Sequence, residues 1–235
     1  MITEILTDWC AEHHLSLSDT QKAAFQTYAD LLIEWNQKMN LTAITDPQEI
    51  AVKHFIDSIS ILTCVTLKEN ASLIDIGTGA GFPGIPLKIM RPDLRLTLLD
   101  SLNKRLVFLE EVCRTLSIEA ELLHARAEEY GQKPAYREQY DYAVSRAVAN
   151  LPSLCEYCIP YIKVGGHFIA MKGPDGETER QAAAQALHLL NSRSDSVNSL
   201  TLPDSSIRTI LCFEKTAPTP SRYPRRGVKI AKSPL

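Results

Sequence analysis

A loop at residues Asp75–Gly84 (DIGTGAGFPG) has the residue types and spacing of a cofactor-binding site. Its glycines permit positive φ angles and let a ligand approach the backbone closely. The end of the loop also matches the dinucleotide pattern G-x-G-x-x-G, which alone is weak evidence. An acidic residue at the end of the strand, followed by the glycines, would repel a pyrophosphate, whereas S-adenosylmethionine carries an ammonium and a sulfonium group. We therefore expect S-adenosylmethionine to be bound by Asp75, Gly77, Gly79 and Gly81.

Two further positions fit a nucleoside cofactor. Asp100 ends the next apolar run, where a carboxylate can bind both hydroxyls of a ribose. NAD and S-adenosylmethionine both have such a ribose, so Asp100 does not discriminate between them. Ala127 and Glu128 follow the third apolar run, where an adenine would lie. A nicotinamide-dependent oxidoreductase therefore stays an alternative, as does a non-catalytic RNA-binding protein with a vestigial cofactor loop.

Short apolar runs alternate with helical stretches from residue 71 onward, which indicates a parallel sheet. The last two runs have no room for a helix between them and predict an antiparallel hairpin. This plan is that of the class I methyltransferase fold, an α/β Rossmann-like sheet that is mostly parallel with a C-terminal antiparallel hairpin. The expected strands are Leu73–Ile76, Leu94–Leu99, Glu121–His124, Tyr140–Val144, His167–Met171, Ser196–Leu200 and Ile207–Phe213.

The first part of the chain is predicted to be helical, because apolar residues recur there at helical spacing. Ser18 is a suitable N-cap, and Asp46 with Pro47 and Glu49 has the pattern of a capping box at the start of a further helix. We expect an N-terminal helical extension over residues 1–65 and a methyltransferase domain over residues 66–235. Both would form one compact unit.

Composition narrows the class of protein. The net charge of −3 argues against a protein that coats nucleic acid, although a local basic patch remains compatible with it. The sequence has neither an apolar run long enough for a membrane span nor a recognisable export signal. The six cysteines are expected to be reduced thiols, with Cys155 and Cys158 on a helix rather than in a metal or redox site. We expect a cytoplasmic monomer without a metal.

Several segments together resemble the bacterial 16S ribosomal RNA guanine-N7 methyltransferases, the RsmG family, also known as GidB or glucose-inhibited division protein B. The resemblance runs from about Leu31 to Gly173, and its most specific parts are the NLTAIT and GFPGIPL phrases. Where the glycine loop of the family often has a proline, this chain has Ala80, a change that we expect to be harmless. The segments are Trp35–Thr45, Lys53–Ser58, Asp75–Pro86, Ser145–Ala147 and Met171–Gly173.

The resemblance implies a Rossmann-like methyltransferase that methylates N7 of one guanine in the decoding-region loop of 16S rRNA. The partner would be 16S ribosomal RNA or the small ribosomal subunit. By position in the motifs, the contacts to S-adenosylmethionine would come from Gly77, Phe82, Ala127, Glu128 and Arg146.

Methylation at N7 of guanine requires no general base, because this nitrogen has an in-plane lone pair and no proton to lose. Catalysis would consist of positioning and electrostatics. Arg146 and Lys172 follow neighbouring strands at one edge of the sheet, and we expect them to be the catalytic residues. Arg146 would orient the base or the carboxylate of the cofactor, with a structural ion pair as the alternative. Four residues at helix ends and turns would line the substrate entrance or brace the helices, namely Asn40, Thr42, His54 and Asp57.

The RNA needs a basic surface. The segment Arg222–Lys232 contains no acidic residue, combines cations with an aromatic ring, and has prolines that oppose a helix. A plain solvated terminus is the alternative. We expect RNA to be bound by Arg126, Arg222, Arg225, Arg226 and Lys229.

Overall fold

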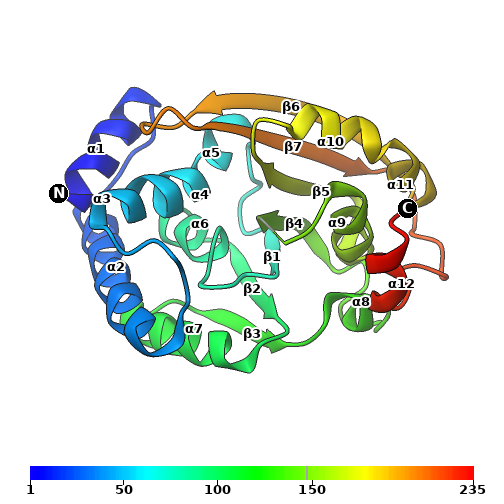
Figure 1. The fold of residues 1–235 in the computed structure, drawn as a ribbon, viewed down its shortest axis with the longest axis horizontal. Helices are drawn as coiled ribbons and strands as arrows, with labels where there is room; N and C mark the ends of the chain where they lie inside the picture. The colour runs from blue at the N-terminus through cyan, green and yellow to red at the C-terminus, as the bar shows by residue number, and fades with distance from the viewer. Residues whose placement is uncertain (147) are drawn as a thin grey trace.

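The computed structural model describes residues 1–146 and 148–235 of the chain, and these residues form an α/β fold around one sheet (Figure 1). Within them the sheet has seven strands in the order β3-β2-β1-β4-β5-β7-β6. Strands β1 to β5 are parallel, and β7 is antiparallel to both β5 and β6, as predicted. The strands are β1 (Ser72–Ile76), β2 (Arg95–Asp100), β3 (Ala120–His124), β4 (Tyr140–Arg146), β5 (Ile162–Lys172), β6 (Ser192–Thr201) and β7 (Ile207–Lys215).

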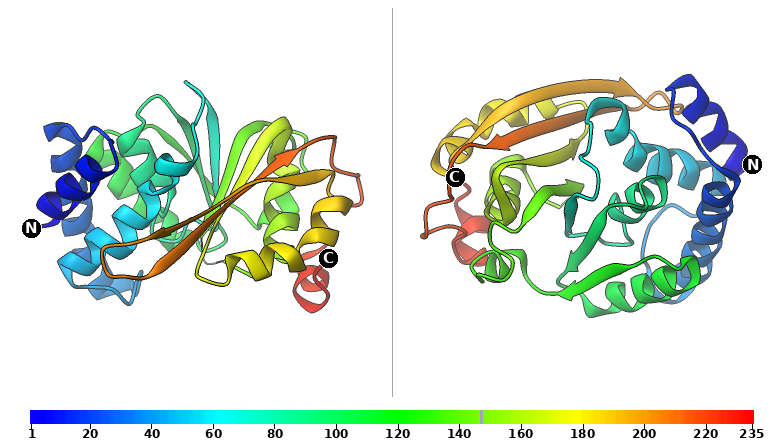
Figure 2. Two further views of the ribbon diagram at one scale, coloured as in Figure 1. Left: turned by 90° about the horizontal axis from the view of Figure 1, so that it is seen from above. Right: turned by 180° about the vertical axis from the view of Figure 1, so that it is seen from behind.

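The N-terminal half of the chain covers one face of this sheet (Figures 1 and 2). Apolar side chains of its helices form one continuous core with alternate residues of the strands, such as Leu73, Val144 and Ile169. The helices of this layer are α1 (Ile2–Glu12), α2 (Asp19–Met39), α3 (Pro47–Glu49), the π-helix η1 (Ile50–Ile56), α4 (Asp57–Ile59), α5 (Ile61–Cys64), α6 (Gly84–Met90) and α7 (Asn103–Leu116).

The C-terminal half supplies the helices on the opposite face. They pack on the other set of alternating strand residues, including Ile74, Ala143 and Phe168, because successive side chains of a strand point to opposite faces. These helices are α8 (Ala127–Tyr130), α9 (Leu151–Cys158), the 3-10 helix η2 (Ile159–Tyr161), α10 (Gly176–Ala182), α11 (Ala184–Leu189) and α12 (Gly227–Lys232).

The capping signals of the first helices are largely confirmed. Ser18 caps α2 in a capping box with Gln21. The Asp46 side chain accepts hydrogen bonds from the backbone N–H groups of Gln48 and Glu49, as an N-cap should. The capping box expected there is wrong, because the Glu49 carboxylate instead pairs with Lys53 one helical turn later.

The prediction that prolines keep the last segment free of helix is also wrong. Helix α12 spans Gly227–Lys232. Pro224 precedes its first residue and Pro234 follows its last one, so neither ring removes a hydrogen bond from the helix interior. Prolines beside a short helix are compatible with it.

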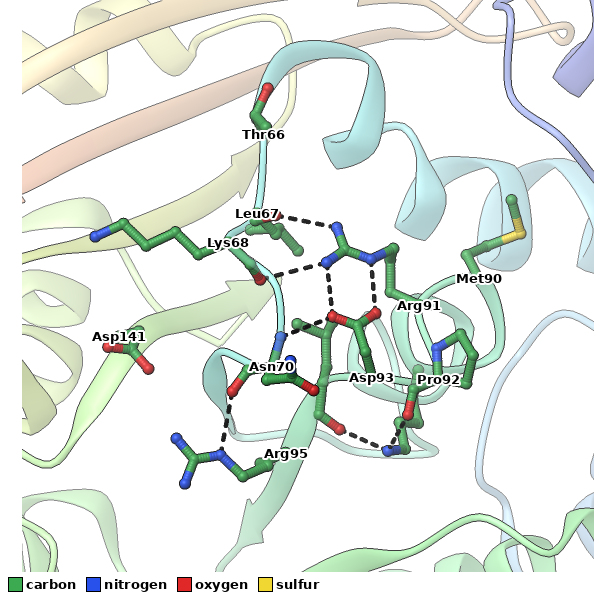
Figure 3. A network of polar contacts seen from close by, with 12 residues as sticks. Thr66, Leu67, Lys68, Asn70, Met90, Arg91, Pro92, Asp93, Arg95 and Asp141 are labelled. Atoms are coloured by element: carbon green, nitrogen blue, oxygen red, sulfur yellow. Dashed lines mark hydrogen bonds and ion pairs between the residues drawn. The ribbon is translucent and has the colours of Figure 1, made fainter.

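A polar network holds the segment between α5 and β1 against the sheet (Figure 3). The Arg91 guanidinium donates to the carbonyl oxygens of Leu67 and Lys68 and to both carboxylate oxygens of Asp93. Asp93 also accepts a hydrogen bond from the backbone N–H of Asn70 at 2.9 Å. These contacts fix the amino ends of β1 and β2, at the edge of the sheet opposite the glycine loop.

Among the helices that the structure describes, none combines the length and the apolar character of a membrane span.

Candidate cofactor and substrate site

A cavity of about 950 Å³ lies at the carboxyl ends of β1, β2 and β4. The strand order reverses between β1 and β4, and ligands of open α/β sheets bind at such a switch point. Eight residues that the sequence predicted for the site line this cavity, namely Gly77, Gly79, Phe82, Asp100, Arg126, Ala127, Glu128 and Arg146. Thr42 and His54, expected at the substrate entrance, line it too, and the other predicted residues lie elsewhere, as described below.

The glycine loop has the backbone conformation that the sequence predicted. Gly77, Gly79 and Gly81 have φ angles of 71°, 61° and 100°, all in the region that favours glycine. Tyr28 of α2 donates a hydrogen bond to the carbonyl oxygen of Ala80, and its ring packs on Phe82 at 5.4 Å. A residue of α2 therefore holds the loop in place.

Asp75 is hydrogen-bonded to the loop and does not line the cavity. Its Oδ2 atom accepts hydrogen bonds from the hydroxyl of Thr78 and the backbone N–H of Gly84, both at 2.8 Å. Within the described residues its buried Oδ1 atom has no hydrogen-bond partner. Complete burial raises the pKa of this carboxyl from 3.8 to about 6, although its two hydrogen bonds oppose the shift.

Asp100 lines the cavity at the end of β2 and is almost fully buried. Its Oδ2 atom accepts hydrogen bonds from the backbone N–H of Gly79 at 3.0 Å and from Nη1 of Arg105 at 3.1 Å. Its Oδ1 atom accepts from the N–H of Leu102 at 2.9 Å. Asp100 thus joins the glycine loop to the start of α7. The sequence did not predict a role for Arg105, because in sequence it cannot be told from a solvent-exposed arginine on a helix.

Arg146 lines the cavity and belongs to a charged cluster with Asp57 and Arg208. One oxygen of the buried Asp57 carboxylate lies 2.8 Å from Nη1 of Arg146, and the other lies 3.0 Å from Nε of Arg208 on β7. The guanidinium of Arg146 also lies over the ring of Phe82, with 5.0 Å between its carbon and the ring centre. Ala147, the last residue of the motif Ser145–Ala147, lies outside the described residues.

His54 is an uncharged member of the same wall. Its ring stacks on Phe82 at 4.4 Å, and its Nδ1 atom lies 3.4 Å from Nη2 of Arg146. Burial, together with the charge of Arg146, lowers the pKa of His54 from 6.5 to about 3. His54 comes from the π-helix η1, a kind of distortion that is frequent at functional sites.

Thr42 completes this wall. A guanidinium only donates hydrogen bonds, so Nδ1 of His54 accepts and Nε2 donates to Oγ1 of Thr42 at 2.9 Å. Oγ1 also accepts from the backbone N–H of Ile44 at 3.0 Å. The hydroxyl hydrogen of Thr42 is therefore available to an acceptor in the cavity. Thr42 and His54 line the cavity, whereas Asp57 braces Arg146 and Asn40 ends α2 in the left-handed conformation. The two alternatives, lining the entrance and bracing the helices, therefore each apply to some of these residues.

Lys172 is buried at the end of β5 and does not line the cavity. Its ammonium group lies 2.8 Å from both the carbonyl oxygen of Ala149 and the Glu179 carboxylate. Ala149 and its neighbours Val148 and Asn150 line the cavity. Lys172 therefore contacts the cavity wall rather than the cavity itself, and its position fits a positioning residue better than a catalytic one.

The basic segment divides into two groups. Arg222, Arg226 and Lys229 are exposed. Arg225 instead forms an ion pair with the fully buried Glu156 of α9, with 2.6 Å between Nη2 and Oε2. This pairing removes its guanidinium from the surface available to RNA.

The cysteines of the C-x-x-C pair, Cys155 and Cys158, are both fully buried on α9, where burial raises the pKa of both thiols. A separate group of side chains, His167, Asp195 and Cys212, brings possible ligand atoms within 4.8 Å of one another on β5, β6 and β7. His167 and Asp195 already face each other there at 3.7 Å. Neither group lines the cavity, so neither serves the cofactor site.

The chain matches one protein family over most of its length. The sequence model of the rRNA small subunit methyltransferase G family, GidB, matches residues 21–208. A ribosomal RNA small subunit methyltransferase G from Alkaliphilus metalliredigens is 51% identical over 233 residues, which cover 98% of each chain. The chain belongs to this family. A protein of the same name from Acetivibrio thermocellus is 50% identical over 100% of this chain and 97% of its own length.

Solved structures agree with the fold. A SAM-dependent methyltransferase from Aquifex aeolicus superposes with a TM-score of 0.55 at 17% identity, covering 74% of this chain and 97% of that one. A geranyl diphosphate C-methyltransferase from Streptomyces coelicolor gives a TM-score of 0.54 at 12% identity over 68% and 78% of the two chains. The class I methyltransferase fold is confirmed. As a member of the rRNA small subunit methyltransferase G family, the chain is an rRNA methyltransferase. The two alternatives, a nicotinamide-dependent oxidoreductase and a non-catalytic RNA-binding protein, are not favoured.

Proposed function

We propose that this enzyme transfers the methyl group of S-adenosylmethionine to N7 of one guanine in 16S ribosomal RNA. The observation that carries the proposal is the cavity at the switch point of the sheet, which joins a glycine loop and a carboxylate on one side to Arg146, His54 and Thr42 on the other. The first group suits a nucleoside cofactor, and the second suits a polar base. Family membership supplies the ribosomal substrate.

The cofactor residues are assigned as follows. Asp100 accepts hydrogen bonds from the ribose hydroxyls, for which Arg105 must share or release its carboxylate. Ala127 and Glu128 contact the adenine, and the backbone of Gly77 and Gly79 follows the methionine part. Asp75 acts indirectly, since its carboxylate holds Thr78 and Gly84.

The guanine is held by side chains that donate hydrogen bonds. None of them needs to act as a general base. Arg146 orients O6 of the guanine or the carboxylate of the cofactor, and the free hydroxyl hydrogen of Thr42 reaches a second acceptor. The transfer moves positive charge from sulfur to the purine ring, which cations in the wall would oppose. The Asp57 carboxylate, which Arg146 shares with Arg208, offsets part of the positive charge at this wall, and the neutral His54 adds none.

The proposal is tested by transfer of labelled methyl from S-adenosylmethionine to 16S rRNA and to small subunits, followed by mapping of N7-methylguanine. Arg146→Ala should lower kcat/KM by roughly 100-fold, the loss typical of one polar group at a reacting centre. Arg146→Lys should not restore the rate, because an ammonium cannot replace the guanidinium fork. Arg193→Ala, at an exposed position on β6, is the matched control.

Near-normal methylation by Arg146→Ala would remove Arg146 from the mechanism. Methylation of another atom, or binding of NAD in place of S-adenosylmethionine in a titration of the wild-type protein, would refute the proposed reaction. The comparison of naked RNA with assembled subunits identifies the substrate particle. We further propose that the enzyme acts in the cytoplasm as a monomer, and sedimentation at assay concentration checks its oligomeric state.

A further inference from the structure

The C-terminal segment, residues 216–235, returns to the cavity from the far end of the antiparallel hairpin. It begins after β7, and its helix α12 lies beside α8 and α9 (Figure 1). Three residues of α12 line the cavity: Gly227, Val228 and Ala231. The segment lies outside residues 21–208, which the family model matches. A segment beyond the residues that the family model matches thus forms a wall of the site.

The segment is held by buried polar contacts before α12 begins. Glu156 of α9 is fully buried and accepts hydrogen bonds from the backbone N–H of Arg225 at 2.7 Å and from its side chain at 2.6 to 3.0 Å. Arg137 donates to the carbonyl oxygens of Tyr223 and Thr219 at 2.8 and 2.6 Å. Charged hydrogen bonds of this kind are strong, so they hold α12 in a defined position at the cavity wall.

Gly227 lies against Glu128, one of the predicted adenine contacts. A Cβ atom at this position would fall on the Glu128 carboxylate, with 2.8 Å to its Cδ atom. Gly227 has an ordinary backbone conformation, so an alanine would meet no strain apart from this contact. The obstacle is the flexible end of the Glu128 side chain, which would have to move.

We infer that α12 is the wall behind the adenine end of the cofactor, and that Gly227 sets the position of the Glu128 carboxylate. The inference rests on the proposed function, because it takes S-adenosylmethionine as the ligand. Gly227 and Arg225 are positioning residues in this arrangement: they act through Glu128 and through the placement of α12. The C-terminal segment thereby sets the affinity for the cofactor.

Calorimetric titration of the full-length protein with S-adenosylmethionine tests the inference. Gly227→Ala should raise the Kd about tenfold, the usual effect of one displaced hydrogen-bonding group, with kcat at saturating cofactor nearly unchanged. Glu128→Ala should raise it by a similar factor. In the double variant the added methyl group no longer meets a carboxylate, so its Kd should equal that of Glu128→Ala. Lys232→Ala, exposed on the same helix, is the control and should bind as the wild type does.

A wild-type Kd for Gly227→Ala would overturn the inference. A double variant about tenfold weaker than Glu128→Ala would overturn it too, because Gly227 would then act independently of Glu128. If Gly227→Ala lowers the melting temperature, Ala231→Leu provides a second test, since Ala231 is exposed at the cavity wall and its enlargement should also weaken binding. Wild-type protein that binds no S-adenosylmethionine would instead refute the proposed function.

Discussion

At the residue scale, His54 makes the stability of the protein depend on pH. Its pKa is about 3 in the folded state and 6.5 as a reference, so the folded state binds a proton less readily than the unfolded chain. Stability from this group is therefore present above pH 6.5 and is lost as the pH falls toward 3.

The size of this loss of stability follows from the two pKa values of His54. Between pH 7 and pH 5 we expect His54 to cost about 2 kcal/mol of unfolding free energy. Urea unfolding at both pH values measures it, with His54→Gln removing the titration and exposed His188→Gln leaving it in place. Comparing the pH dependence of the unfolding free energy between wild type and His54→Gln isolates the contribution of His54. Asp75 contributes to both proteins alike, and its raised pKa makes the folded state more stable as the pH falls. The same pH dependence in both would contradict the assignment.

At the element scale, a buried ion pair contributes to the attachment of α12. Arg225→Ala leaves the Glu156 carboxylate buried without its partner, which should cost about 3 to 5 kcal/mol. Denaturant unfolding measures the loss, and limited proteolysis should detect cleavage near α12. Arg226→Ala, its exposed neighbour, should change stability by less than about 0.5 kcal/mol.

A second substitution distinguishes a lost charge pair from a lost contact. Adding Glu156→Gln to Arg225→Ala should recover part of the stability, because a neutral amide is less costly to bury than a carboxylate. A double variant less stable than Arg225→Ala would show that the carboxylate is stabilised by other groups.

The elements themselves were accessible from sequence, because apolar periodicity and caps are local signals. All seven strands, the cap at Ser18 and the positive φ angles of the glycine loop follow from such signals. The roles of Lys172 and Arg225 did not follow, since both depend on partners far along the chain, Glu179 in one case and Glu156 in the other. A sequence reveals that a residue is cationic, but its neutralising partner appears only with the fold.

At the scale of the whole molecule, a net charge of −3 leaves RNA binding to local basic surface. The exposed cations of the C-terminal segment, Arg222, Arg226 and Lys229, are the proposed contacts. Replacing all three by glutamine should reduce the slope of log K against log salt by about 2, at roughly 0.7 to 0.9 per phosphate contact. Affinity should fall most at low salt, where these contacts contribute most.

Filter binding with 16S rRNA fragments over a salt series measures this slope. Lys68, Arg95 and Arg114, three exposed cations that precede β1, begin β2 and lie in the last turn of α7, provide a matched triple variant away from the cavity. An unchanged slope for the C-terminal triple variant would exclude that surface as the RNA contact.

The hydrogen bond from Tyr28 to Ala80 has a consequence for dissecting and recombining this enzyme. The proposed boundary between residues 65 and 66 separates the donor from the acceptor, so a fragment that starts at residue 66 would lack the support of its own cofactor loop. A chimera that takes its first helices from one relative and its loop from another would inherit two surfaces that were never selected together. Exchanges should succeed where α2 and the glycine loop come from the same parent.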